Sequence, residues 1–290
     1  MCDKDHCEED LEKYIRAGRV TRRDFGGLTA GVGLAMMLPR AANAQAVTEK
    51  DVEIKTPDGT CDAYFVHPSS GAHAAVLVWP DILGLRPAFR MMGKRLAESG
   101  YSVLTVNPFY RGKRAPVIPA GAAFDAETRA IVGPLAQHLN ATTHVSDAKA
   151  FIAWLDQQPQ VDKGRKVGTT GYCMGGPITM RTAASVADRV GAAASFHGGG
   201  LVTQNPDSPH LLVPQMKAQY LFAVAENDDM REPEAKNVLR ETFASAKLDA
   251  EIEVYAAAHG WCPPDSQVYD EAQAERAWSR MLALFERALA

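Results

Sequence analysis

The sequence lacks the features that mark several large classes of protein. Its 31 basic and 35 acidic residues give a formal net charge of -4, so no excess of positive charge indicates binding to nucleic acid. It contains no internal repeat, no low-complexity tract and no Pro/Ser-rich linker that would divide it. With 46% hydrophobic residues over a length of 290, the chain is expected to fold around a substantial packed core.

A long apolar run is also missing, which decides how the N-terminus is interpreted. The weakly apolar stretch 26–38 is well short of the roughly 20 residues that span a bilayer. It follows Thr21-Arg22-Arg23-Asp24-Phe25 and precedes Ala42-Asn43-Ala44, an order typical of a twin-arginine export signal. We therefore predict a signal peptide over 1–44, read by the twin-arginine export machinery, and a periplasmic mature chain over 45–290 without a stable membrane anchor. A buried core helix with a chance Arg pair is the alternative.

Cysteine is scarce, and two of the five residues, Cys2 and Cys7, would leave with the signal. The mature chain keeps Cys61, Cys173 and Cys262. An odd number in a compartment that allows disulfides leaves at least one thiol unpaired within the monomer. Cys61 and Cys262 could pair, but the sequence does not give the distance between them.

Alternating strand-like and helix-like segments predict the fold class. Two β-type runs, 52–55 and 61–67, flank the turn residues Pro57-Asp58-Gly59 and predict a hairpin at a sheet edge. Further strands are expected over 74–79, 102–106, 166–170, 192–196, 220–225 and 251–255, and helices over 87–99, 146–158 and 232–247, after residue 173 and at the C-terminus. This order predicts one α/β domain over 45–290, with a mostly parallel central sheet flanked by helices.

The strongest chemical signal is Gly171-Tyr172-Cys173-Met174-Gly175-Gly176, between a predicted strand and a predicted helix. It has the form of a nucleophile elbow in which Cys stands in place of Ser. Such a turn strains the backbone of the nucleophile and requires small residues two positions away on each side, as Gly171 and Gly175 are. The helix N-terminus favours a thiolate, and the amide of Met174 is placed to donate to an oxyanion. A merely buried thiol is the alternative interpretation of Cys173.

The other members of a triad follow in the expected chain order of nucleophile, acid and histidine. The predicted strand 220–225 runs into Asp228 and Asp229, and the strand 251–255 runs into His259. A neutral imidazole can accept the thiol proton, while a carboxylate fixes its tautomer and stabilises the imidazolium. The predicted triad is Cys173, Asp228 and His259, with Asp229 as the alternative acid.

Together these residues resemble the dienelactone hydrolases, also called carboxymethylenebutenolidases, which are Cys-His-Asp α/β-hydrolases. The resemblance spans nearly all of the mature chain. It is carried by Pro80-Asp81-Ile82-Leu83-Gly84-Leu85, Pro108-Phe109-Tyr110-Arg111, the segments 171–176 and 225–228, and His259-Gly260-Trp261. The resemblance implies an α/β-hydrolase fold and an enzyme that hydrolyses esters or lactones without a cofactor or a metal.

The same resemblance implies roles for the segment after the first buried strand. Asp81 occupies the position of an acidic residue, usually Glu, that accepts the nucleophile's proton when the substrate arrives. A loop or helix-capping acid is the alternative for Asp81. The amides of Ile82 and Met174 would together form the oxyanion hole.

Residues of the substrate site follow less directly from the resemblance. Tyr110, Arg111 and Trp261 are expected there, with Arg111 as an approximate counterpart of the family's cationic contact to the substrate carboxylate. The irregular stretch 111–122 follows a strand end, where open α/β sheets bind ligands, and is expected to line a pocket mouth. His197, in a glycine-rich loop without P-loop features, is interpreted as structural or substrate-lining. The family's second substrate arginine is missing beyond His259, which departs from the dienelactone pattern.

The sequence as a whole predicts that a small ester or lactone is cleaved through a thioester on Cys173, with a small molecule as the only partner of the mature chain. A thioesterase or general carboxylesterase is the alternative among enzymes, because fold and elbow do not determine the leaving group. A non-catalytic binding protein on the same fold is the alternative from another class.

Overall fold

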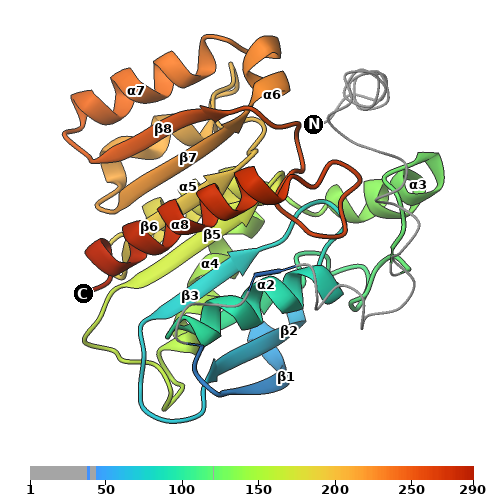
Figure 1. Cartoon of the computed structure of the whole chain (residues 1–290), viewed down its shortest axis with the longest axis vertical. Coiled ribbons are helices and arrows are strands. Elements are labelled where there is room, and N and C mark those ends of the chain that lie inside the picture. The colour runs from blue at the N-terminus through green and yellow to red at the C-terminus, as the bar shows by residue number, and fades with distance from the viewer. Residues whose placement is uncertain (1–37, 40–43, 120) are drawn as a thin grey trace.

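The computed structural model describes residues 38–39, 44–119 and 121–290 (Figure 1). The predicted signal peptide therefore lies almost entirely outside the described residues. Within the described part, no helix is both long enough and apolar enough to cross a membrane.

A single eight-stranded sheet organises the chain, in the order β1-β2-β4-β3-β5-β6-β7-β8. Its strands are β1 (Val47–Thr56), β2 (Gly59–Pro68), β3 (Ala75–Trp79), β4 (Ser102–Val106), β5 (Val167–Tyr172), β6 (Val190–Phe196), β7 (Gln219–Ala225) and β8 (Ala250–Tyr255). The six strands β3 to β8 all pair in parallel with their neighbours among themselves. Strands β1 and β2 form an antiparallel hairpin at one edge, and β2 pairs antiparallel with β4. The predicted α/β class, mostly parallel sheet and edge hairpin are confirmed.

Helices cover both faces of the sheet (Figure 1). They are α2 (Pro87–Glu98), α3 (Ala126–Ala136), α4 (Ala141–Leu155), α5 (Gly175–Ser185), α6 (Glu226–Arg231), α7 (Ala235–Ser245) and α8 (Glu271–Ala288), with a 3-10 helix η2 (Pro209–Gln215). Side chains alternate between the faces of a strand, so β3 sends Val76 and Val78 into the core beneath α2 and α8. Leu77 and Trp79 pack on the opposite face with α4, α5 and α7.

A third apolar cluster lies outside these two layers and forms part of the site's surroundings. Phe109, Val117, Ile118 and Val132 are buried together, with Phe124 packed against them. Helix α3, which the sequence analysis did not predict, begins after Asp125, whose side chain accepts a hydrogen bond from the Thr128 amide. This cluster fixes the segment between β4 and α3 near the carboxyl edge of the sheet.

Candidate active site

The backbone at Cys173 has the strained geometry of a tight strand-to-helix turn. Cys173 has a φ of 53°, in the left-handed region, between the end of β5 and the start of α5. A Cβ added to Gly171 would lie 2.1 Å from the carbonyl oxygen of Gly175, and one added to Gly175 would lie 2.4 Å from the carbonyl oxygen of Trp79. Only glycine fits at these two positions, so the turn depends on both.

The thiol of Cys173 is positioned where a helix dipole favours an anion. The residue is 7% exposed and directly precedes Met174, the N-terminal cap of α5. The unpaired amides of a helix N-terminus carry a partial positive charge, which stabilises a nearby thiolate. The amide of Met174 belongs to this group.

A short hydrogen bond joins Asp228, on helix α6 after β7, to His259, in the loop after β8. The distance from Asp228 Oδ2 to His259 Nδ1 is 2.6 Å. The backbone amide of His259 also donates to Asn227 Oδ1 at 2.8 Å, which fixes the loop that carries the imidazole. Asp229 faces elsewhere and accepts a hydrogen bond from Lys236 Nζ at 2.6 Å. The geometry therefore selects Asp228 over Asp229 as the partner of His259.

A cavity of about 270 Å³ brings the distant segments together at the carboxyl edge of the sheet. Both Cys173 and His259 line it, together with Asp81 and Ile82. Its other described lining residues are Leu83, Arg86, Ala122, Ala123, Phe124, Asp125, His197, Asn227, Ala258, Gly260, Asp265, Ser266, Gln267 and Val268. The cavity is of a size suited to a small molecule.

His197 is an unexpectedly close neighbour of the elbow. Its Nδ1 accepts a hydrogen bond from the Cys173 amide at 3.1 Å, and an accepting Nδ1 in a neutral ring requires the proton to sit on Nε2. Its ring centroid lies 5.0 Å from that of His259 and 5.1 Å from that of Trp261. His197 is fully buried and lines the cavity, which agrees with the structural or substrate-lining role predicted for it.

Asp81, which lines the cavity, is held in an ion pair with Arg86. Arg86 Nη1 donates to Asp81 Oδ1 at 2.6 Å and Nη2 donates to Oδ2 at 2.9 Å, while the Leu83 amide donates to Oδ1. The opposite edge of the same guanidinium binds Asp265, in the loop after His259. Arg86 thereby ties the loop that carries the Ile82 amide to the loop that carries His259. The sequence analysis missed both Arg86 and Asp265.

The structure places Tyr110, Arg111 and Trp261 outside the lining of the cavity that contains Cys173, and their part in substrate binding stays a prediction. Arg111 donates to Asp147 at 2.7 and 2.8 Å and to Asp58, and Tyr110 Oη donates to Asp147 at 2.8 Å. None of the three predicted residues lines the cavity that contains Cys173. Arg111 points to Asp147 and not into this cavity, because Asp147 is a buried carboxylate that needs a cationic partner. Among the described residues of the stretch expected at the pocket mouth, Ala122 alone lines this cavity.

Trp261 packs between the core and the ring of His197. It is fully buried and stacks on Tyr255 with an interplanar angle of 17°. Trp261 is therefore a core residue, and its ring packs against His197, which accepts the hydrogen bond from the Cys173 amide.

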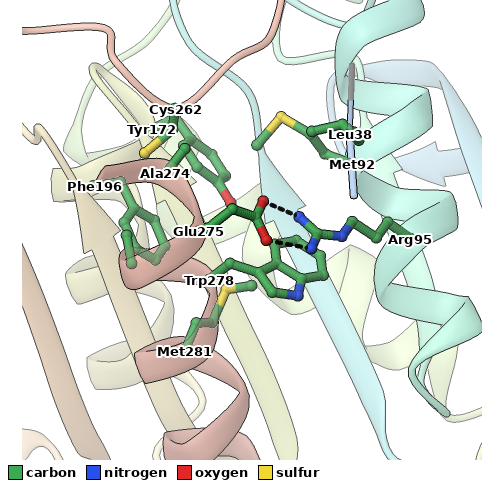
Figure 2. A pocket seen from close by; sticks show the side chains of 11 residues that line it. Leu38, Met92, Arg95, Tyr172, Phe196, Cys262, Ala274, Glu275, Trp278 and Met281 are labelled. Carbon is green, nitrogen blue, oxygen red and sulfur yellow. Dashed lines mark hydrogen bonds and ion pairs between the residues drawn. The ribbon is translucent and has the colours of Figure 1, made fainter. Parts of the chain in front are cut away.

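Cys61 and Cys262, the other cysteines of the described residues, are free thiols in separate regions of the core. Cys61 packs on the face of the sheet covered by α4 and α5, whereas Cys262 belongs to the core beneath α2 and α8. Figure 2 shows Cys262 beside a small gap of about 20 Å³, close to the ion pair between Arg95 of α2 and Glu275 of α8. Burial raises the pKa of both thiols. The disulfide that the sequence left open does not form.

Within residues 38–39, 44–119 and 121–290, no group of three or more His, Cys, Asp or Glu side chains is arranged to hold a metal ion.

Comparison with known proteins places the chain among relatives of similar length and fold. The family model described as the dienelactone hydrolase family matches residues 61–289. The carboxymethylenebutenolidase of Rhodococcus opacus is 28% identical over 243 residues, which cover 81% of this chain and 90% of that protein. Carboxymethylenebutenolidase 1 of Cupriavidus pinatubonensis is 26% identical over 227 residues, covering 78% of this chain and 91% of that protein.

A solved structure gives the corresponding result for the fold. A dienelactone hydrolase-like promiscuous phosphotriesterase from metagenomic libraries matches with a TM-score of 0.70 at 22% identity, covering 84% of this chain and 100% of that chain. The α/β-hydrolase fold implied by the sequence is therefore confirmed.

Proposed function

Because the chain belongs to the dienelactone hydrolase family, we propose that it hydrolyses a lactone or a small carboxylic ester with Cys173 as the nucleophile. One observation carries the proposal. Cys173 of the elbow and His259, which Asp228 holds by a hydrogen bond, come from segments far apart in the chain and line a single cavity. This is the constellation that nucleophilic acyl transfer requires.

The proposed reaction divides ester cleavage into two acyl transfers. His259 takes the thiol proton, and the sulfur of Cys173 attacks the carbonyl carbon while the carbonyl electron pair moves onto oxygen. Collapse of this intermediate expels the alkoxide, which takes the proton from His259 and leaves a thioester. Water then gives a proton to His259 and attacks the thioester. The carbon–sulfur bond breaks, and the thiol is restored as the carboxylic acid leaves.

The protein groups around the reacting atoms support this sequence of steps. Asp228 holds His259 through Nδ1, so the imidazolium formed in each step is stabilised by a carboxylate. We assign the amides of Ile82 and Met174 to the oxyanion, because Ile82 lines the cavity and Met174 caps the helix after the thiol. Both amides then act when negative charge develops on oxygen.

The ion pair with Arg86 limits what Asp81 can do in this reaction. Arg86 donates to both oxygens of the Asp81 carboxylate, and a proton accepted from the thiol would remove the negative charge on which this ion pair depends. In the arrangement described here, His259 is therefore the base, and Asp81 orders the loop that carries Ile82.

The test compares the hydrolysis of 4-nitrophenyl butanoate by the mature chain, by Cys173→Ala and by Cys262→Ala. Cys262 is a buried thiol outside the cavity and serves as the matched control. We expect turnover to disappear with Cys173 and to survive the control substitution. Equal activity in all three proteins would reject the nucleophile. Binding of the ester without hydrolysis by any of them would favour a non-catalytic binding protein.

A thioesterase would use the same residues, because the geometry at Cys173 acts on the acyl group and not on the atom that leaves. A parallel assay with butanoyl coenzyme A separates the two activities. A higher kcat/KM for the thioester than for the oxygen ester would assign the chain to that class.

We propose further that residues 1–44 direct export by the twin-arginine route and that residues 45–290 form one periplasmic hydrolase domain. The order of Arg22-Arg23, the short apolar stretch and Ala42-Asn43-Ala44 supports this, as does the start of β1 at Val47, shortly after the proposed cleavage site. Fractionation of cells should recover a periplasmic protein that begins at Gln45. The double substitution Arg22→Lys and Arg23→Lys should retain the precursor in the cytoplasm.

A further inference from the structure

The charges around the cavity are unequal in sign. Asp81, Asp125 and Asp265 line it with carboxylates, and Arg86 is the only cationic side chain among its described lining residues besides the two histidines. With neutral histidines, acidic groups therefore outnumber basic ones. A substrate that enters this cavity meets a surplus of negative charge.

Arg86 has no hydrogen-bond donor left for a substrate. A guanidinium carries five N–H donors in a fixed fork. In Arg86, Nε binds Asp265, Nη1 binds Asp81 and the carbonyl of Gly84, and Nη2 binds both carboxylates. The side chain is 2% exposed. A carboxylate on the substrate could bind Arg86 only by displacing one of two buried ion pairs.

Asp125 adds a negative charge at the exposed rim. Its backbone lies between Phe124 of the apolar cluster and the first turn of α3, and its carboxylate accepts the Thr128 amide. The hydrogen bond to that amide lowers the pKa of Asp125 and keeps it ionised at neutral pH. An anionic substrate approaching over this rim is repelled.

Apolar side chains make up much of the remaining lining. Ile82 and Leu83 approach from the loop after β3, Ala122 and Phe124 from the segment before α3, and Val268 from the loop after His259. These groups favour an acyl chain of carbon and hydrogen by removing it from water.

We propose that the site selects uncharged, apolar esters or lactones and discriminates against substrates that carry a carboxylate. This inference rests on the proposed hydrolase function. Two independent features support it: the saturation of Arg86 by Asp81 and Asp265, and the negative charge that Asp125 places at the rim.

The test uses three aryl esters that differ only at the far end of a six-carbon acyl chain. They are 4-nitrophenyl hexanoate, the mono-4-nitrophenyl ester of adipic acid, and its methyl ester, which is polar but uncharged. We expect the methyl ester to exceed the free half-ester in kcat/KM by about tenfold or more at low salt, and the ratio to fall as salt screens the rim charge. The comparison with the methyl ester separates charge from polarity.

Two variants locate the effect. Asp125→Asn removes the rim charge and should raise kcat/KM for the half-ester relative to that for the methyl ester. Asp265→Asn should act in the same direction by weakening one of the two partners of Arg86. Asp229→Asn is the control, because Asp229 binds Lys236 and does not line the cavity. Its ratio of the two substrates should match that of the unmodified chain.

Equal or faster hydrolysis of the half-ester by the unmodified chain would overturn the inference, and so would an Asp125→Asn variant with an unchanged ratio. If none of the esters is hydrolysed in a Cys173-dependent manner, the proposed function itself fails and the inference falls with it. Asp125 is exposed, so its substitution tests the proposal even where Asp265→Asn fails to fold.

Discussion

Replacing Asp228 by Asn should abolish most of the activity by reversing the tautomer of His259. Asp228 Oδ1 accepts a hydrogen bond from Arg231 at 3.2 Å, while Oδ2 accepts one from His259 Nδ1 at 2.6 Å. In the variant, Arg231 attracts the carbonyl oxygen of Asn, which turns the amide NH2 toward Nδ1. The imidazole proton then moves to Nε2, and the ring can no longer accept the thiol proton.

The size of the effect follows from this geometry. Loss of the correct tautomer in a buried triad lowers kcat by about 10⁴-fold. Asp228 is 17% exposed, so water can partly replace the lost interaction. We expect kcat/KM to fall by ~10²- to 10⁴-fold, equivalent to ~3 to 5.5 kcal/mol of transition-state stabilisation. The assay is release of 4-nitrophenolate from the butanoate ester.

Asp229→Asn is the matched control for this experiment. Asp229 lies on the same helix and is 22% exposed, but it pairs with Lys236. Its substitution removes one partly exposed ion pair and should change kcat/KM by less than about twofold. The reasoning would be refuted if Asp228→Asn stayed within about threefold of the unmodified chain, or if Asp229→Asn fell as far.

Three further outcomes are expected. Gly171→Ala should lower the free energy of unfolding, measured in urea, by about 1–3 kcal/mol, because the added Cβ would lie 2.1 Å from the Gly175 carbonyl oxygen. The control is Gly199→Ala, whose Cβ would meet nothing within 4 Å and which should change the free energy of unfolding by less than ~0.5 kcal/mol. Iodoacetamide at about pH 8 should label Cys173 in the mature chain and spare Cys61 and Cys262, whose burial raises the pKa of each thiol; labelling of all three at one rate would contradict this. Burial lowers the pKa of His144 from an ordinary 6.5 to about 3. Between these two values the unfolded chain binds more protons than the folded chain, so the free energy of unfolding should decrease by up to ~1.4 kcal/mol for each unit by which the pH is lowered. His144→Asn should flatten this slope, and an unchanged slope in the variant would contradict the prediction.

The strands were the most predictable part of the fold. Apolar runs mark buried parallel strands directly, and β4 coincides with its predicted range of 102–106. Helix starts were less accessible, because they depend on caps. Helix α4 begins at Ala141 instead of 146, since the side chain of Asn140 accepts from the amides of Thr142 and Thr143. Helix α3 was missed because its cap, Asp125, follows an irregular segment.

The candidate site divides in the same way. Cys173 lies in a local pattern, so its strained turn could be predicted from neighbouring residues. The preference for Asp228 over Asp229 could not, because both follow one strand and only the orientation of α6 decides which faces His259. The pairing of Arg111 with Asp147 could not be predicted either, because the two residues are distant in sequence and no local pattern links them.

Arg86 and Asp265 illustrate the limit of local patterns most clearly. The two residues are 179 positions apart, and their ion pair exists only because the loops after β3 and β8 meet at one edge of the sheet. In the sequence, each of the two residues looks like an ordinary charged residue of a loop. The saturation of Arg86, on which the inferred substrate preference depends, therefore required the fold.

The most direct test of the account is rapid-quench mass spectrometry of the mature chain during turnover of 4-nitrophenyl butanoate, followed by mapping of the modified peptide. The account predicts a butanoyl adduct on the peptide that contains Cys173, bound as a thioester that hydroxylamine removes. Continued turnover with the acyl group on another residue, or with no acyl-enzyme in the Cys173 peptide at any quench time, would contradict it.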